Sequence, residues 1–275
     1  MTLDTAKDLV IEVKNLVTYY GTRKILDGVD FDVRAGEIMV VMGGSGSGKS
    51  TLMRHLLSLE RASSGSIRVL GKDISALNTV ERGELYRELG VAFQTGALFS
   101  SMTVGENIML PLADHTKLDR QTMEIMMRMK LEVVDLAGFE DLMPAELSGG
   151  MVKRAALARA VVMDPKILFC DEPSAGLDPV VSASIDDLLL RLRDAMKMSI
   201  IVITHELESA FKIADRITIL DNGKVLMVGS VDDMKTSDNE RIQNILHRRT
   251  EEEILDIDAY LERLTGIDVG PGVQL

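Results

Sequence analysis

The nonapeptide GGSGSGKST, residues 43–51, is the sequence feature that most constrains how this chain can fold. It matches the pattern G-x-x-x-x-G-K-[ST] in full, follows an apolar run typical of a strand, and opens a helical pattern. In that context the glycines allow successive backbone N–H groups to turn towards one anion, and the start of the helix adds a favourable dipole. The pattern therefore predicts a phosphate-binding loop between a strand and a helix.

Two side chains of this loop have distinct expected roles. The Lys49 ammonium would reach the β- and γ-phosphates of a nucleotide, and the Ser50 hydroxyl would ligate Mg²⁺. The alternative is a chance glycine-rich turn, which the complete match and its context disfavour. The residues expected to contact the nucleotide here are Gly43, Gly44, Ser45, Gly46, Ser47, Gly48, Lys49, Ser50 and Thr51.

A pair of carboxylates follows a second apolar run, in ILFCDEPSAGLD, residues 167–178. Four apolar residues predict a buried strand that delivers Asp171 and Glu172 to its carboxyl end. Asp171 suits Mg²⁺, directly or through water, and Glu172 is placed to orient or deprotonate an attacking water. A solvated turn is the alternative for such a pair. Cys170 lies within the apolar run, so we expect a small buried side chain rather than a reactive thiol.

Strand-like runs stand on both sides of a helical block, which indicates the fold class. A helix is expected over 49–59, and residues from about 104 to 163 are almost entirely helical in pattern. The strand-like runs cover 9–16, 29–33, 37–43, 66–71, 89–94, 166–173, 199–206 and 216–229. This arrangement predicts an α/β core with an inserted helical subdomain at about 95–163, all within a domain spanning 1–231.

Composition excludes several classes of protein. A formal net charge of −12 argues against a sequence-independent nucleic-acid binder, which needs a basic footprint. The single cysteine rules out an intramolecular disulfide and fits a reducing compartment. No apolar run is long enough for a membrane span, and the first residues do not resemble a secretory signal. We therefore expect a cytoplasmic protein that would need a partner to supply any membrane spans.

The character of the chain changes after residue 231. Residues 232–275 carry eleven acidic and five basic side chains. Apolar residues at helical spacing predict two short amphipathic helices, the first around Ile242, Ile245 and Leu246 and the second over 254–264. This acidic extension either folds back on its own domain or docks on another chain, and the sequence leaves both open.

Several further positions are weak alone but form an ordered series along the chain. Tyr20 precedes Gly21, where an aromatic ring could stack on adenine; Gln94 ends a strand where the helical block begins; and His205 ends another strand. The stretch ELSGG, residues 146–150, resembles half of an anion site without a cation of its own. The series is tyrosine, phosphate loop, glutamine, LSGG, Asp-Glu, SAGLD and histidine.

This series resembles the nucleotide-binding subunit of ABC transporters over residues of about 9–231. The resemblance implies a P-loop fold with a RecA-like core, an antiparallel β-subdomain and a helical subdomain carrying LSGG. It also implies that two subunits meet head to tail and sandwich two ATP molecules. It implies that Tyr20 stacks on adenine, that Gln94 senses the metal and the γ-phosphate, and that Glu172 and His205 are catalytic. The implied metal ligands are Ser50, Gln94 and Asp171. The residues implied to contact the partner's ATP are Ser148, Gly149, Gly150 and Asp178.

A narrower resemblance lies in FQTGALFSSMTVGENIMLPLADHTKL, residues 93–118, and in LSGGM where most ABC proteins have LSGGQ. Both are similar to the ATPases of Mla/Mce-type lipid transport systems, the MlaF and Mkl group. That similarity implies a homodimer at the cytoplasmic face of the inner membrane, an MlaE-type permease and an Mce-domain partner. The implied cargo is glycerophospholipid, with a sterol-like lipid as the alternative. A small STAS-domain, MlaB-like protein is a further implied partner. Phe99, Met102 and Leu110 are candidates to line the groove for the permease, with ordinary core as the alternative.

The resulting hypothesis is an ATP-hydrolysing subunit that drives lipid transport with Mg²⁺ as cofactor. An importer ATPase for small polar solutes is the main alternative. A DNA-remodelling ABC ATPase would need long coiled coils or paired cysteines between residues 43 and 148, which the chain lacks. A non-hydrolysing regulatory subunit would have a degenerate phosphate loop or carboxylate, and both are intact.

Overall fold

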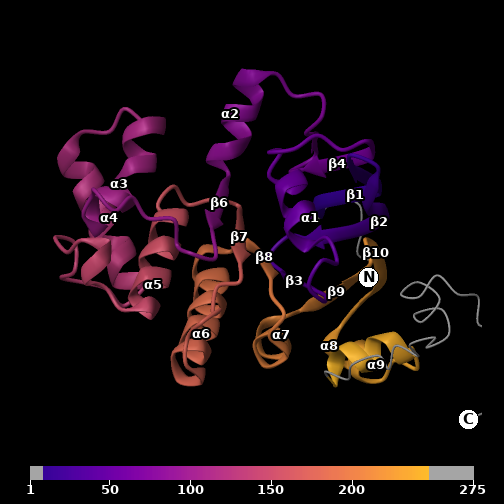
Figure 1. The fold of residues 1–275 in the computed structure, drawn as a ribbon. Helices are drawn as coiled ribbons and strands as arrows, with labels where there is room; N and C mark the ends of the chain where they lie inside the picture. Colours follow the sequence, from indigo (N-terminus) through magenta and orange to yellow (C-terminus); the bar gives the residue numbers. More distant parts are fainter. Residues whose placement is uncertain (1–8, 248–275) are drawn as a thin grey trace, which may run out of the picture. The chain divides into compact units, whose positions relative to one another are not determined.

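The computed structural model describes residues 9–247 (Figure 1). The chain divides after Ser237 into two compact units, and the first contains two β-sheets. The larger sheet has six strands: in order across it these are β10 (Lys224–Gly229), β9 (Arg216–Asp221), β3 (Ile38–Met42), β8 (Ser199–Ile203), β7 (Ile167–Asp171) and β6 (Leu89–Ala92). All neighbours are parallel except β10, which runs antiparallel to β9. Every residue of β3 and β8 is buried, as expected for central strands of a parallel sheet covered on both faces.

The smaller sheet is antiparallel and forms a subdomain of its own. Its strands, in order, are β2 (Arg23–Arg34), β1 (Leu9–Tyr20), β4 (Ser64–Val69) and β5 (Lys72–Asp73). Helix α1 (Lys49–Leu56) contributes Leu52 and Leu56 to a hydrophobic cluster that also contains Val29 of β2 and Phe169 of β7. One core therefore joins the two sheets around the helix that follows the phosphate loop.

The inserted helical block is the magenta to salmon part of Figure 1. Its elements are α3 (Val104–His115), α4 (Arg120–Val133), the 3₁₀ turn η1 (Pro144–Glu146) and α5 (Gly149–Ala160). Side chains at their boundaries cap the helices: Thr103 starts α3, Asp119 starts α4 and Ser148 starts α5. The structure thus has the α/β architecture expected from the sequence, with a mostly parallel sheet, an antiparallel sheet and a helical insertion.

Several helices of this unit were not predicted from the sequence, and the first of them lies between β5 and β6. Helix α2 (Thr79–Arg87) buries only Leu85, so it lacks the apolar stripe that identifies most helices. Its start is nevertheless a capping box, in which the Asn78 side chain accepts from the N–H groups of Val80 and Glu81 while Glu81 accepts from the N–H of Asn78. The capping pattern was the available signal for this helix.

The end of the first unit differs slightly from the boundary placed at residue 231. Helices α6 (Pro179–Met196) and α7 (Leu207–Ile213) complete the core, and α8 (Val231–Lys235) follows β10. Met234 of α8 is fully buried, so the unit continues to Ser237. In the second unit, α9 (Glu240–Leu246) contains the first of the two expected amphipathic helices, and the second, over 254–264, lies outside the described residues. None of the helices within 9–247 is both long and apolar enough to cross a membrane.

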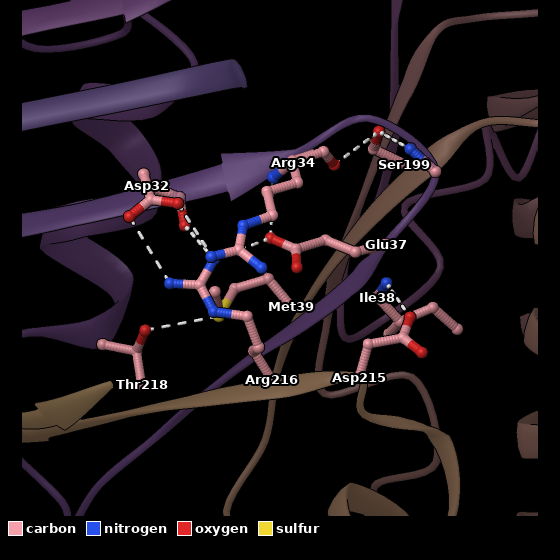
Figure 2. A network of polar contacts seen from close by, with 10 residues as sticks. Asp32, Arg34, Glu37, Ile38, Met39, Ser199, Asp215, Arg216 and Thr218 are labelled. Atoms are coloured by element: carbon pink, nitrogen blue, oxygen red, sulfur yellow. Dashed lines mark hydrogen bonds and ion pairs between the residues drawn. The ribbon is translucent and has the colours of Figure 1, made fainter. Parts of the chain in front are cut away.

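A partly buried ionic network ties the two sheets together at the start of β3 (Figure 2). The Arg216 guanidinium of β9 lies 2.9 Å from a carboxylate oxygen of Asp32 on β2 and 3.2 Å from Glu37. Glu37 also accepts from the backbone N–H of Arg34 at 2.7 Å. Burial raises the pKa of the Glu37 carboxyl above its ordinary value, although the Arg34 N–H and the Arg216 charge oppose the rise. The network anchors the end of β3 opposite to the phosphate loop.

We expect Arg216→Met to lower the free energy of unfolding by about 1.5–3 kcal/mol, because Glu37 would stay buried without its cation. The loss should shrink as the pH falls, since protonation of Glu37, which its raised pKa favours, removes the charge that needs Arg216. Urea denaturation at several pH values measures both effects.

The matched control is Lys14→Met, which removes an exposed ion pair with Glu12. It should change the free energy of unfolding by less than about 0.5 kcal/mol. Equal effects of the two substitutions, or a loss for Arg216→Met that grows at low pH, would contradict this role of the network.

Candidate functional site

The candidate site lies where three parallel strands of the larger sheet end. Strand β3 leads into the phosphate loop, β7 ends at Asp171, and β8 leads into Thr204 and His205. The register pairs Asp171 with Ile203, and Thr204 donates its N–H to the Val41 carbonyl at 3.3 Å. Because parallel strands place their carboxyl ends at one edge, residues from distant parts of the sequence meet there.

The phosphate loop depends on glycine at two positions. A Cβ on Gly43 would lie 2.0 Å from the carbonyl oxygen of Leu220, a contact that no side chain tolerates. Gly48 has φ 106°, and a Cβ there would lie 2.7 Å from Cδ2 of Leu26. The loop therefore packs against β9 and β2 through bare backbone, while Gly44, Ser45 and Gly46 remain exposed to a ligand.

Lys49, the first residue of α1, turns back over the loop. Its Nζ donates to the carbonyl oxygens of Gly43 at 2.7 Å and Gly44 at 2.8 Å. Burial lowers the pKa of the Lys49 ammonium, against the attraction of Glu172 and Asp171. The Lys49 ammonium is half-buried and bonded only to neutral carbonyl oxygens, so it would be bound more strongly by negatively charged phosphate oxygens.

The other side chains of the loop differ in exposure. Ser50 is exposed in the first turn of α1, whereas Thr51 is buried. Ser47 has a buried hydroxyl with no hydrogen-bond partner within 9–247. The exposed hydroxyl of Ser50 is thus the side-chain oxygen of this turn that a ligand can reach.

The chemistry of the Asp171 carboxylate and the Ser50 hydroxyl fits a magnesium ion. Burial raises the pKa of the Asp171 carboxyl, the neighbouring Glu172 raises it further, and Lys49 and Lys153 oppose the rise. A divalent cation would favour the ionised form that burial disfavours. Within 9–247, no group of three or more His, Cys, Asp or Glu side chains could hold a metal by itself. One carboxylate and one hydroxyl suit Mg²⁺, which usually takes its remaining oxygens from phosphate and water.

Glu172 is held in an unusual backbone conformation. Its φ of 47° lies in the left-handed region, and its N–H donates to the Ile203 carbonyl at 2.8 Å. Its Oε1 lies 2.8 Å from Nδ1 of His205, and its Oε2 accepts from the Thr204 hydroxyl at 3.2 Å. The carboxylate is largely buried while the His205 ring is 63% exposed, so the histidine covers it from the solvent side. The structure brings Glu172 and His205 into direct contact.

Tyr20 and Gln94 were also expected at the site. Tyr20 is partly exposed, and its hydroxyl donates to Oε2 of Glu60 at 2.5 Å, which orients the ring. Gln94 is exposed, and its carbonyl accepts from Lys153. No hydrogen bond or ion pair among the described residues joins either side chain to the phosphate loop.

The LSGG segment forms the exposed start of α5. The Ser148 hydroxyl caps the helix by accepting from the N–H of Met151 at 3.3 Å, and Asp178 caps α6 in the same way. A Cβ on Gly150 would lie 2.6 Å from Cγ1 of Val181, so the glycine permits close packing of α5 on α6. Ser148, Gly149 and Asp178 are exposed, and within 9–247 none of them contacts the phosphate loop of its own chain through a hydrogen bond.

Sequence reasoning missed three residues that support this edge. Lys153 of α5 donates to the carbonyls of Gln94 and Glu172, and Arg159 of the same helix donates to those of Gly96 and Ala97. Glu206 accepts from the hydroxyls of Ser174 at 3.0 Å and Ser182 at 3.3 Å. The position of Glu206 directly after His205 was a signal for that residue, whereas nothing in the apolar pattern of α5 marked Lys153 or Arg159.

Known proteins that are similar to this chain include ATP-binding proteins of transport systems. A family model described as "ABC transporter" matches residues 26–175. The chain is 39% identical over 241 residues to the probable ribonucleotide transport ATP-binding protein mkl of Mycobacterium leprae, covering 88% of this chain and 70% of the relative. It is 38% identical over 237 residues to the intermembrane phospholipid transport system ATP-binding protein MlaF of Haemophilus influenzae. That match covers 86% of this chain and 90% of the relative.

A third relative and a solved structure complete the comparison. The methionine import ATP-binding protein MetN of Clostridium tetani is 36% identical over 225 residues, covering 82% of this chain and 70% of the relative. The dimeric post-hydrolysis state of the ATP-binding cassette MJ0796, bound to ADP and Pi, superposes with a TM-score of 0.74 at 28% identity, covering 80% of this chain and 98% of the other.

We expect Glu172→Gln to lower ATP turnover by about 10²–10⁴-fold, because a neutral amide cannot orient and deprotonate water as a carboxylate does. Nucleotide affinity should stay near that of the unchanged chain, since Lys49 and the loop are untouched. Steady-state phosphate release and equilibrium ATP binding measure the two quantities.

Glu84→Gln serves as the control, because its exposed carboxylate pairs only loosely with Lys72 at 3.8 Å, away from the strand ends. Undiminished turnover in Glu172→Gln, with ATP binding intact, would remove Glu172 from the catalytic role.

Proposed function

The chain belongs to the ABC transporter family and is an ATP-hydrolysing subunit, and on that ground we propose that it energises lipid transport across a cell envelope, with glycerophospholipid as the cargo. The observation that carries the cargo is the similarity to MlaF over 90% of that relative's length. The site supports the ATPase part of the proposal, because Lys49, Asp171 and Glu172 meet at one sheet edge.

In this proposal each group at the edge has a defined task. The loop N–H groups and Lys49 hold the β- and γ-phosphates, and Tyr20 stacks on adenine. Ser50 and Asp171 would hold Mg²⁺, with Gln94 as a further ligand, and the bound ion would supply positive charge beside the phosphates. Glu172 orients the attacking water and takes its proton, while His205 and Thr204 fix the position of that carboxylate.

The second half of the site comes from another copy of the chain. Ser148, Gly149 and Gly150 are exposed or lie next to an exposed position, and they open a helix whose dipole favours an anion. We assign them, with Asp178, to the ATP held by the partner's Lys49, as part of a homodimer. The dimeric form of MJ0796, whose chain this one matches over 98% of its length, supports that assignment.

A permease of the MlaE type is the proposed membrane partner. Phe99 is 52% exposed, so it is not ordinary core, and Met102 and Leu110 are half-buried. The fully buried Asn107 shapes this loop, since its side-chain amide bonds the N–H of Phe99 at 2.7 Å and the carbonyls of Phe99, Met102 and Thr103. A loop held rigidly with an apolar tip suits a protein contact.

The rest of the proposed assembly rests on the resemblance of residues 93–118 and of LSGGM to the Mla/Mce group. An Mce-domain protein and a small STAS-domain, MlaB-like protein are the further partners, and the subunit lies at the cytoplasmic face of the inner membrane. Closure of the dimer on ATP moves the segment after Gln94, and the permease responds to that movement.

We expect the intact complex, purified through this chain from its own cells, to contain glycerophospholipid in amounts stoichiometric with the complex. Mass spectrometry of extracted lipid, with quantification against the protein, is the measurement. A complex assembled on a Phe99→Asp variant is the control and should lose both the permease and the lipid, because a charge at the apolar contact is costly to desolvate.

The competing function is an importer ATPase for a small polar solute, which the MetN relative favours. A soluble solute-binding protein in the complex, with no bound lipid and no Mce-domain partner, would establish that function and overturn the lipid proposal.

A further inference from the structure

Lys153 is a buried cation that lies between two parts of the site. It is on the second turn of α5 and is 9% exposed. Its Nζ donates to the carbonyl oxygen of Gln94 and, at 3.0 Å, to that of Glu172. One ammonium therefore joins the segment that leaves β6 to the segment that leaves β7.

The carbonyl of Glu172 is part of a constrained backbone. Its N–H is fixed by the Ile203 carbonyl, and its own carbonyl also accepts from the N–H of Ala175 at 3.2 Å. A non-glycine residue in the left-handed region stores about 1–3 kcal/mol of strain and persists only where its surroundings hold it. Lys153 is one of the groups that hold this peptide, and the peptide sets where the Glu172 carboxylate points.

The segment after Gln94 is attached to α5 at further points. Arg159 donates to the carbonyls of Gly96 at 2.9 Å and Ala97 at 2.7 Å. Gly96 has φ 77°, and a Cβ there would lie 2.8 Å from Cγ1 of Val152. Residues 94–97 are thus bonded to α5 through their backbone, so they would move with that helix.

Helix α5 begins at the LSGG segment, so Lys153 connects that segment to the Gln94 and Glu172 carbonyls. The first turn of α5 carries Ser148, Gly149 and Gly150, and Lys153 lies only one turn further along. A displacement of the helix start would reach both carbonyls through the Lys153 side chain. Burial lowers the pKa of this ammonium while Glu172 and Asp171 oppose the effect, so the charge is held at an energetic cost that its two bonds offset.

We propose that Lys153 is a positioning residue that couples the LSGG helix and the Gln94 segment to the orientation of the Glu172 carboxylate. This inference rests on the proposed catalytic role of Glu172 and the proposed docking of LSGG on the partner's ATP. In this proposal Lys153 acts through the peptide of Glu172, whose carbonyl accepts from its Nζ at 3.0 Å. Its N–H groups, rather than its bulk, are what the coupling requires.

The test is Lys153→Met in the full-length chain, with steady-state ATPase kinetics and equilibrium ATP binding. We expect kcat to fall by about 10–100-fold, as a small misplacement of a catalytic group does, with KM and ATP affinity within about twofold of the unchanged chain. Lys153→Arg should recover most of the lost rate because it restores N–H donors at the same position. Lys130→Met is the matched control: Lys130 is similarly buried in the helical block but pairs with Asp164 and contacts neither carbonyl.

A second readout separates coupling from a general loss of structure. In a Glu172→Gln background, Lys153→Met should lower the residual rate by less than about twofold, because residues that act through one group are not additive. The proposal would be overturned if the loss of kcat in the double variant equalled the product of the two single losses. It would also be overturned if Lys153→Met and Lys153→Arg lost kcat equally. If the methionine variant fails to fold, Lys153→Leu, which also lacks N–H donors, is compared with Lys153→Arg under the same criteria.

The two proposals fail in different ways. Full turnover in Glu172→Gln would remove the catalytic role of Glu172 itself. Lost turnover in Glu172→Gln together with normal kcat in Lys153→Met would leave that role intact and overturn only the coupling by Lys153.

Discussion

The parallel pairing of β3, β8 and β7 is the constraint on which the site depends. It places the ends of three strands at one edge, so the phosphate loop, Asp171 and the Thr204–His205 segment meet although more than 150 residues of sequence separate the first from the last. The strands are buried along their length, and the Arg216 network fixes the opposite end of β3. The sheet therefore sets where these segments begin, and Lys153 of α5 further holds the segments that follow β6 and β7.

The charges of Lys49 and Asp171 at this edge of the sheet are suited to binding a charged ligand rather than to pairing with each other. Burial lowers the pKa of Lys49 and raises that of Asp171, so both ionised forms are less favourable than in water. A triphosphate with its magnesium ion would stabilise both ionised groups together. Glu172 differs from these two, because His205, Thr204 and the constrained peptide hold its carboxylate in place. Lys49 and Asp171 are therefore suited to binding the nucleotide and its metal ion, and Glu172 is suited to catalysis.

The predictable part of the site was the part encoded by adjacent residues. The phosphate loop and the Asp171–Glu172 pair each occupy one short segment beside an apolar strand, and Cys170 is fully buried as expected. Lys153 and Arg159 were missed because their partners are backbone carbonyls far away in sequence, which leave no pattern. Helix α2 was missed because it has no apolar stripe. The roles of Ser148 and Asp178 stay predictions, since within one chain both residues act as helix caps.

The central claim is that the LSGG segment completes a site on a second copy of the chain. Cysteines at Ser45 and Ser148 test it directly, because both positions are exposed and the native Cys170 is buried. In a Glu172→Gln background with Mg²⁺ and ATP, mild oxidation should give a covalent dimer, and omission of ATP should reduce its yield strongly. Monomer alone, uncrosslinked or linked within one chain while ATP binding is intact, would contradict the claim.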